Sequence, residues 1–205
     1  ELDVLRQLFA LPDTIAVAMA FIAAYNAKRA GVRHYVQQMM FNTPPATSPR
    51  MDLAKMLAKR ELLATIEDDD FRIIVETRGG LSSYPPDMDA ARGHLAYTTL
   101  LQLAMKPDIV HVVAYTEAFY AAGPEDVIAS CKIARQVIEK ALFDFPDLTD
   151  DDRVQARKRE LVSEAIVLLE AIDRLGRARG SATGGRGRTR LPRRPAVSIT
   201  PRWRS

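Results

Sequence analysis

The sequence has little cysteine and no long apolar run. Its single cysteine, Cys131, cannot form an internal disulfide, which is typical of proteins in a reducing compartment, and we expect a small packed side chain there. The most apolar segment, residues 14–31, turns polar at Tyr25 and Asn26 before it reaches the roughly 18 apolar residues of a membrane span. The first residues, ELDVLRQLF, lack the layout of a signal peptide. These absences predict a cytoplasmic protein with no membrane partner.

Acidic residues are missing from residues 176–205, which carry nine arginines. Subtracting these nine charges from the net charge of +3 leaves residues 1–175 with −6, so no nucleic-acid partner is expected for this part of the chain. Residues 178–205 are rich in Arg, Gly and Pro and lack hydrophobic periodicity. We expect them to be a disordered or non-native tail, with an RNA-binding tail as the alternative. Residues 1–177 form the predicted catalytic domain.

Motifs for metals and for nucleotide phosphates are also missing. No group of His, Cys, Asp and Glu has the spacing of metal ligands, so no metal site is expected. The Gly-x-Ser-x-Gly and His-Glu-x-x-His motifs do not occur either. The loop after the first predicted strand lacks the Gly-x-Gly-x-x-Gly pattern that binds dinucleotide phosphates.

A repeated pattern is present in place of these motifs. Three apolar runs begin 37 residues apart, at His34, Phe71 and Asp108, and each is followed by a loop and a helical pattern. The helices begin where Pro or an acidic residue suits a first turn. These starts are Ser48–Pro49, Pro86–Asp87 and Gly123–Asp126. With one helix before the first strand, from Asp13 to about Ala30, and one over residues 151–175, the predicted order is α-βα-βα-βα-α.

This order predicts an α/β fold with a parallel sheet, because the strands are apolar on both faces and are joined by helices. Either a doubly wound sheet or a (β/α) barrel would place a ligand at the carboxyl ends of the strands. The long loops, and the absence of a phosphate-binding pattern, favour the barrel. A full TIM-type barrel takes about 250 residues and eight strands. The chain is therefore predicted to be an incomplete barrel of about three strands.

Polar residues gather on one side of each predicted strand, because alternate residues point to opposite faces. They are His34, Gln38 and Asn42 in the first strand, Arg72, Glu76 and Arg78 in the second, and His111, Tyr115 and Glu117 in the third. Several lie at carboxyl ends, where an active-site mouth is expected. We expect His34 and His111 to be hydrogen-bonded residues of the core or of a barrel layer.

Arg78 and Glu117 are the candidate catalytic residues. A guanidinium stays charged and can hold a carboxylate through two hydrogen bonds, so Arg78 is the expected substrate clamp. Asn42 and Arg50, from the loop after the first strand, are candidate substrate ligands too. One alternative is that Arg78 and Glu117 pair with each other or with neighbouring residues to satisfy buried charge at the sheet edge. The other is that the Asn42–Arg50 loop is a proline-stiffened connection.

The loop after Arg78 is a second candidate for ligand contact. Gly79 and Gly80 would let the backbone approach a ligand closely, and the aromatic ring of Tyr84 could cover that ligand. An ordinary Gly-Gly turn, with Tyr84 packed under Pro85 and Pro86, is the alternative.

Three stretches of the sequence resemble a known family. They are DTIAVAMAFIAAYNAKRAGVRHYVQQMM, FRIIVETRGGLSSYPPDMDAARGHL and DIVHVVAYTEAFYAAGPEDVIASCKIARQVI. In element order and loop lengths, residues 10–175 resemble the carboxyl-terminal half of the barrel subunit of adenosylcobalamin-dependent glutamate mutase (methylaspartate mutase). Shared features include an aromatic-Pro-x-Asp loop, here Tyr84–Asp87, and a Glu that follows a strand ahead of a Pro-initiated acidic helix.

The resemblance implies a radical carbon-skeleton isomerase of amino-acid metabolism, acting on glutamate or 3-methylaspartate. In the family, a separate cobalamin-binding subunit caps the barrel and shares adenosylcobalamin with it, and the assembly is an oligomer. Glu117 matches the family's acid that holds the adenosine ribose, with Tyr115 beside it, and Leu81 and Tyr84 would line the path of the adenosine. The lysine that accompanies this acid in the family is absent, since Ala114 and Tyr115 stand in that part of the strand.

Two other functions stay open from the sequence. One is a barrel lyase of the aldolase type, in which Glu117 would act as acid and base and Arg78 would anchor the substrate. The other is a degenerate fragment without catalytic activity. The family's substrate-binding arginines lie mostly in the half of the barrel that has no counterpart here, so the resemblance does not carry over the substrate.

Overall fold

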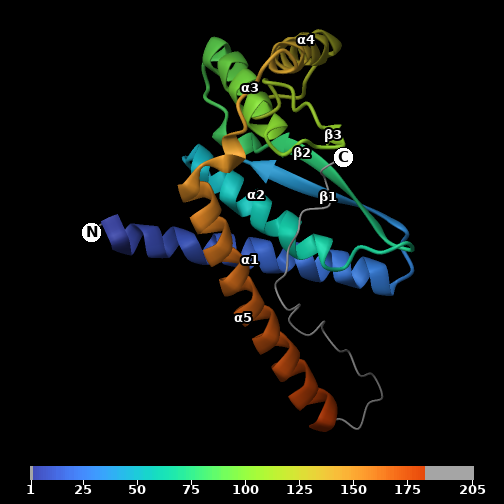
Figure 1. Cartoon of the computed structure of the whole chain (residues 1–205). Coiled ribbons are helices and arrows are strands. Elements are labelled where there is room, and N and C mark those ends of the chain that lie inside the picture. The colour runs from blue at the N-terminus through green and yellow to red at the C-terminus, as the bar shows by residue number, and fades with distance from the viewer. Residues whose placement is uncertain (1, 183–205) are drawn as a thin grey trace. The chain divides into compact units, whose positions relative to one another are not determined.

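The computed structural model describes the backbone of residues 2–182 and the side chains of residues 13–176. The chain divides into two compact units, Glu1–Ala165 and Ile166–Ser205. The first unit contains the whole β-sheet, and the second begins within the last helix (Figure 1). The described residues form a mixed α/β structure of five α-helices and one three-stranded parallel sheet.

The sheet lies in the order β1-β2-β3, which is the order of the strands along the chain. Strand β1 is His34–Phe41, β2 is Arg72–Gly79 and β3 is Ile109–Val110. Strand β1 pairs with β2 along its whole length, from His34 opposite Arg72 to Phe41 opposite Gly79. Strand β3 pairs with β2 over two residues only, with Ile109 opposite Glu76.

The helices begin largely where the capping residues predict. They are α1 (Leu2–Arg29), α2 (Pro49–Ala64), α3 (Met88–Leu103), α4 (Pro124–Ala141) and α5 (Asp152–Ala182). The Ser48 hydroxyl accepts a hydrogen bond from the Met51 N–H, and the Asp87 carboxylate accepts one from the Ala90 N–H at 2.8 Å. Such caps pair the free N–H groups of a first turn. The predicted end of α1 near Ala30 is confirmed, but its predicted start was wrong, because Asp13 lies inside this helix, where it forms an ion pair with Lys55 of α2.

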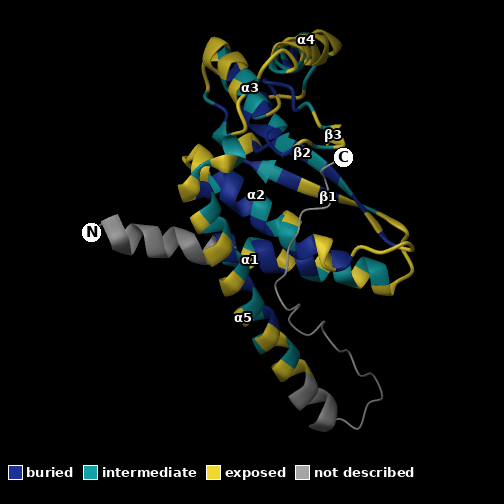
Figure 2. Ribbon diagram, viewed as in Figure 1, coloured by how far each residue is buried: buried dark blue, intermediate teal, exposed yellow. Residues whose placement is uncertain are grey.

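One face of the sheet is covered and the other is open. Apart from the half-buried Tyr35, the odd-numbered residues of β1 and β2, such as Met39, Phe41 and Thr77, are buried. The even-numbered residues between them are exposed or half-buried (Figure 2). Right-handed crossovers between strands in sequential order place the connecting helices on one side of a sheet, which accounts for this alternation. We call the even-numbered side of β1 and β2, with Ile109 and His111, the open face.

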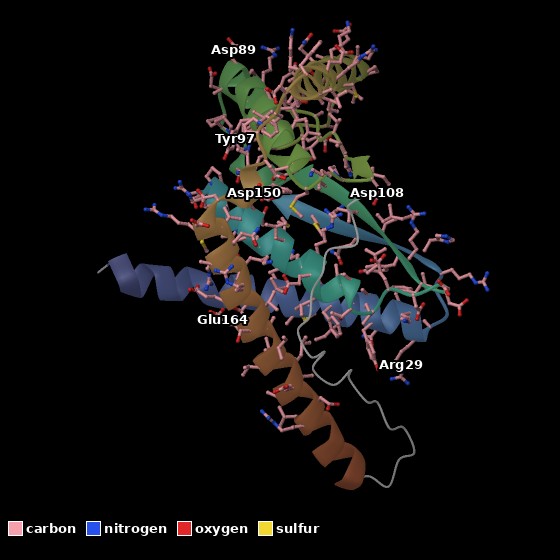
Figure 3. All side chains as sticks on the ribbon, in the orientation of Figure 1. Arg29, Asp89, Tyr97, Asp108, Asp150 and Glu164 are labelled. Carbon is pink, nitrogen blue, oxygen red and sulfur yellow. The ribbon has the colours of Figure 1, made fainter. Side chains whose placement is uncertain are left out.

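Strand β3 is much shorter than the predicted strand over residues 108–115. The Asp108 side chain (Figure 3) accepts a hydrogen bond from the Val75 N–H at 2.8 Å. The His111 N–H donates a hydrogen bond to the Thr77 carbonyl at 2.8 Å. The chain then leaves the sheet and turns, with the Glu117 N–H donating to the Ala114 carbonyl. Within the described region no strand pairs with the outer side of β3, and no residue after His111 pairs with β2.

Three other predictions concern the ends and surface of the fold. Cys131 was expected to be packed, but it is exposed on α4. Helix α5 runs to Ala182, so it includes the first residues of the predicted tail, and the rest of that prediction lies outside the described residues. Within the residues that the structure describes, no helix combines the length and the apolarity needed to cross a membrane.

Candidate functional site

The loops after β1 and β2 meet at the carboxyl edge of the sheet. Asn42 follows the last residue of β1, has a φ of 53° and is buried. Its N–H donates to Asp52 Oδ2 at 2.6 Å, and its carbonyl accepts a hydrogen bond from the Ser83 hydroxyl. The Gly80 N–H donates to the Phe41 carbonyl at 2.8 Å, which continues the ladder into the loop. The two loops therefore form one hydrogen-bonded rim.

The rim leaves no room for a side chain at Gly80. A Cβ at Gly80 would lie 2.1 Å from Thr43 Oγ1 and 3.1 Å from the Phe41 carbonyl oxygen. The close approach predicted for the two glycines therefore occurs at Gly80, and it is an approach to the neighbouring loop of the same chain. At Gly79 a Cβ would make ordinary contacts, the nearest with Thr98 Oγ1 at 3.4 Å.

A buried charge cluster lies behind the rim, between α1 and α2. Lys55 Nζ lies 3.2 Å from Asp13 Oδ1 and 3.3 Å from Asp52 Oδ1, and it donates to the Thr43 carbonyl at 2.6 Å. Burial raises the pKa of Asp52 to about 6. Burial also lowers the pKa of Lys59 to about 8, and the charges of Lys55, Asp13 and Asp52 act on this lysine as well. Each of Asp13, Asp52 and Lys55 is at most 5% exposed. The cluster therefore fixes the backbone of the first loop and faces no ligand.

The two candidate tyrosines are part of a small hydrophobic core with Ala91, Leu95 and Val113. The Tyr84 hydroxyl is 3.4 Å from the Val113 carbonyl oxygen, and burial raises the pKa of Tyr84 to about 12. The Tyr115 hydroxyl accepts a hydrogen bond from Arg92 at 3.1 Å, and the Arg92 guanidinium lies 4.7 Å from the centre of the Tyr115 ring. Both rings support the rim from behind.

Arg78 and Glu117 each contact a backbone group and do not form an ion pair with each other. Glu117 is exposed and uses Oε1 to accept the Ala114 N–H at 2.8 Å, while Arg78 is half-buried and donates to the Gly79 carbonyl at 3.3 Å. Among the described residues no ion pair joins Arg78 to Glu117, so both charges remain available at the rim.

The other candidate ligands differ in their access to solvent. Leu81 is 36% exposed in the short helix that follows Gly80. Arg50 is directed to another part of the chain, since its Nε lies 3.2 Å from Asp151 Oδ2. Asn42 is buried, and within the described residues its side-chain oxygen Oδ1 has no hydrogen-bond partner.

A line of polar side chains crosses all three strands on the open face, and the sequence alone did not identify it as a site. Glu76 Oε1 accepts a hydrogen bond from Gln38 Nε2 at 3.1 Å and lies 3.0 Å from His111 Nδ1. Burial alone would raise the pKa of Glu76, but hydrogen bonds from Gln38 and His111 and the nearby charges of His111 and Arg78 outweigh it, so this pKa is lowered. The carboxylate is therefore ionised at neutral pH.

Two cavities of the described region lie away from this rim. One of about 300 Å³, lined by Arg33, His34 and the acidic residues 67–70 among others, lies at the amino ends of β1 and β2. Within the described residues no group of three or more His, Cys, Asp and Glu is arranged to hold a metal ion. Comparison with known proteins gives no match, either to a protein-family model or to a curated sequence.

Proposed function

We propose that the chain is part of the catalytic (β/α) barrel of an adenosylcobalamin-dependent amino-acid mutase of the glutamate mutase type. The resemblance over residues 10–175 suggests this chemistry. The structural observation that supports it is the sequential parallel order β1-β2-β3, with one covered and one open face.

The strand order favours a barrel over a doubly wound sheet. A doubly wound sheet reverses its strand order at a switch point and carries helices on both faces. In a barrel, strands follow one another in sequence, helices cover the outside, and inward side chains form layers. The described sheet has no reversal, and its open face carries Gln38, Glu76 and His111 in a line. Such a line would form one polar layer inside the barrel.

The described rim fits adenosylcobalamin in part. Glu117 and Leu81 are exposed at the rim and could contact a ribose hydroxyl and an apolar ring face. Tyr84 and Tyr115 are buried with their hydroxyls hydrogen-bonded, so they would position the rim and would not touch the cofactor. When bound, this cofactor supplies a carbon radical, and the protein positions the reactants and excludes water. A cobalamin-binding subunit is the proposed partner.

Arg78 is the proposed clamp for the carboxylate of the amino-acid substrate. It lies near the carboxyl end of β2 on the open face and is half-buried, so a ligand there would meet a partly desolvated guanidinium. Of the other two proposed ligands, Arg50 is paired with Asp151 and the Asn42 amide is buried. We therefore propose that these two residues contribute less to substrate binding than Arg78.

We expect this chain alone to be inactive, so the test is to mix a complete barrel that contains it with a cobalamin-binding subunit, adenosylcobalamin and glutamate, and to follow the cobalamin absorbance. A glutamate-dependent change is expected, and Glu117→Gln should reduce it by about one to a few powers of ten without changing the melting temperature. Leu142→Gln, at an exposed position far along the chain from the rim, is the matched control. No change with the unaltered barrel, or equal changes with and without Glu117, would contradict the proposal.

A lyase of the aldolase type is the second candidate, and one observation favours its acid/base chemistry. Glu117 is poorly suited as the base, because one of its oxygens already accepts the Ala114 N–H. The hydrogen-bonded Glu76–His111 pair is a better proton acceptor, since a carboxylate that holds one imidazole nitrogen leaves the other free.

A further inference from the structure

The Glu76–His111 contact determines which nitrogen of the imidazole carries the proton. An ionised carboxylate only accepts hydrogen bonds, so the 3.0 Å contact requires Nδ1 of His111 to carry a hydrogen. In neutral His111, Nε2 then bears the lone pair, and the ring is held as a base. Gln38 donates to the same carboxylate oxygen at 3.1 Å and fixes its position.

Arg78 lies next to this base. The His111 N–H donates to the Thr77 carbonyl, which continues the β2–β3 register by one residue and sets His111 opposite Arg78. The charge of Arg78 also acts on Glu76, the partner of His111. The His111 side chain is 44% exposed, so its free nitrogen is open to a ligand from the side of the open face.

A second His–Arg pair on the same face lacks the carboxylate. His34 lies opposite Arg72 at the amino end of β1 and β2. In the described part of the chain no carboxylate is hydrogen-bonded to the His34 ring. The contrast shows that the strand register alone does not produce a base with its orienting acid, because Glu76 is needed as well.

We propose that Glu76, His111 and Arg78 form a proton-transfer site for a small carboxylate that carries an acidic C–H bond, such as a 2-oxo acid. Arg78 holds the substrate carboxylate, and His111 Nε2 takes a proton from the carbon next to the substrate carbonyl. The C–H electron pair moves into an enolate, and the new imidazolium is stabilised by Glu76. Return of a proton from Nε2 to carbon restores both partners, so no oxidant or reductant is required.

A 2-oxo acid is the class that this geometry fits. A neutral imidazole is a weak base, so the C–H bond must be activated by an adjacent carbonyl group. The carboxylate of the same molecule supplies the charge that a guanidinium recognises. This activity goes beyond the proposed mutase function and requires no cobalamin, so its assay in the absence of cobalamin can fail or succeed independently.

The first experiment measures the tautomer of His111 in the whole chain by long-range proton–nitrogen NMR above pH 8. The three histidines are assigned with His34→Gln and His111→Gln. We expect Nδ1–H in His111 of the unaltered chain. In Glu76→Gln we expect a shift toward Nε2–H, because the glutamine amide can donate a hydrogen bond to Nδ1 whereas a carboxylate can only accept one. Nε2–H in the unaltered chain would overturn the proposal.

The second experiment follows exchange of the C3 hydrogens of 2-oxobutyrate in D₂O by proton NMR, without cobalamin. We expect exchange above the buffer rate, at least a tenfold loss in His111→Gln, and a several-fold higher half-saturating concentration in Arg78→Gln. His34→Gln and Arg72→Gln are the matched controls on the same face and should behave like the unaltered chain. Exchange at the buffer rate, or equal losses in the His34 and His111 variants, would overturn the proposal.

Discussion

Charged side chains lie on both sides of the sheet, and their surroundings differ. On the covered side, Lys55, Asp13 and Asp52 are almost fully buried and bind each other and the backbone of the first loop. On the open face, Glu76 and His111 are in contact but remain partly accessible. A buried charge that loses its partner destabilises a fold strongly, whereas an accessible one is solvated by water. The covered cluster should therefore govern stability, and the open pair should govern chemistry.

The largest expected effect follows from removing the buried cation. Lys55→Met leaves Asp13 and Asp52 without their shared partner and frees the Thr43 carbonyl. We expect a loss of about 3–5 kcal/mol in the free energy of unfolding, measured by urea denaturation. Lys132→Met, at an exposed site of α4, is the control and should stay within about 0.5 kcal/mol. Similar losses in both variants would contradict a structural role for the cluster.

The same cluster should make the free energy of unfolding depend on pH, through Asp52. The pKa of Asp52 is about 6 in the folded chain against 3.8 ordinarily, so the folded state binds more protons between these values. This carboxyl group therefore makes the free energy of unfolding rise as the pH falls from 6 toward 4, by on the order of 2–3 kcal/mol. Asp52→Asn should remove that rise, and an unchanged pH profile in this variant would refute the assignment.

Gly80→Ala should have an intermediate effect, because its Cβ would meet Thr43 Oγ1 at 2.1 Å. We expect a loss of about 1–3 kcal/mol as the rim shifts. Gly93 lies inside α3, and a Cβ there would have no heavy atom within 4 Å, so Gly93→Ala should instead gain roughly 0.5–1 kcal/mol through helix propensity. Thermal melting of the two variants checks whether the signs are opposite.

The smallest effect on stability is expected on the open face. Glu76→Gln keeps the shape of the side chain and a hydrogen-bond acceptor, and the contact is partly exposed. We expect a change of less than about 1 kcal/mol in the free energy of unfolding. A loss as large as that of Lys55→Met would show that Glu76 is a structural residue.

Much of the fold was predictable because its signals are local. Strand β1 begins at His34 as predicted, and Ser48 and Asp87 cap helices as their side chains suggest. The length of β3 was not predictable, because it depends on a neighbouring strand that the described sheet lacks. The ion pair of Asp13 with Lys55 was not predictable either, because Lys55 is distant in sequence but adjacent in the fold.

The candidate site was predictable to a lesser degree. Alternation along the strands correctly placed Gln38, Glu76 and His111 on one face, but their joint hydrogen bonding depends on the register between strands. The burial of Tyr84 and Tyr115 follows from packing between α3 and the chain after β3, which no local pattern specifies. The roles predicted for Arg78 and Glu117 stay predictions.

The most direct test of the difference between the two sides is urea unfolding of the double variant Glu76→Gln/His111→Gln alongside Lys55→Met. The double variant removes the open pair, and Lys55→Met breaks the covered cluster. We predict that the double variant stays within about 1 kcal/mol of the unaltered chain, while Lys55→Met loses at least about 3 kcal/mol. Equal losses in the two variants, or a larger loss in the double variant, would contradict the account.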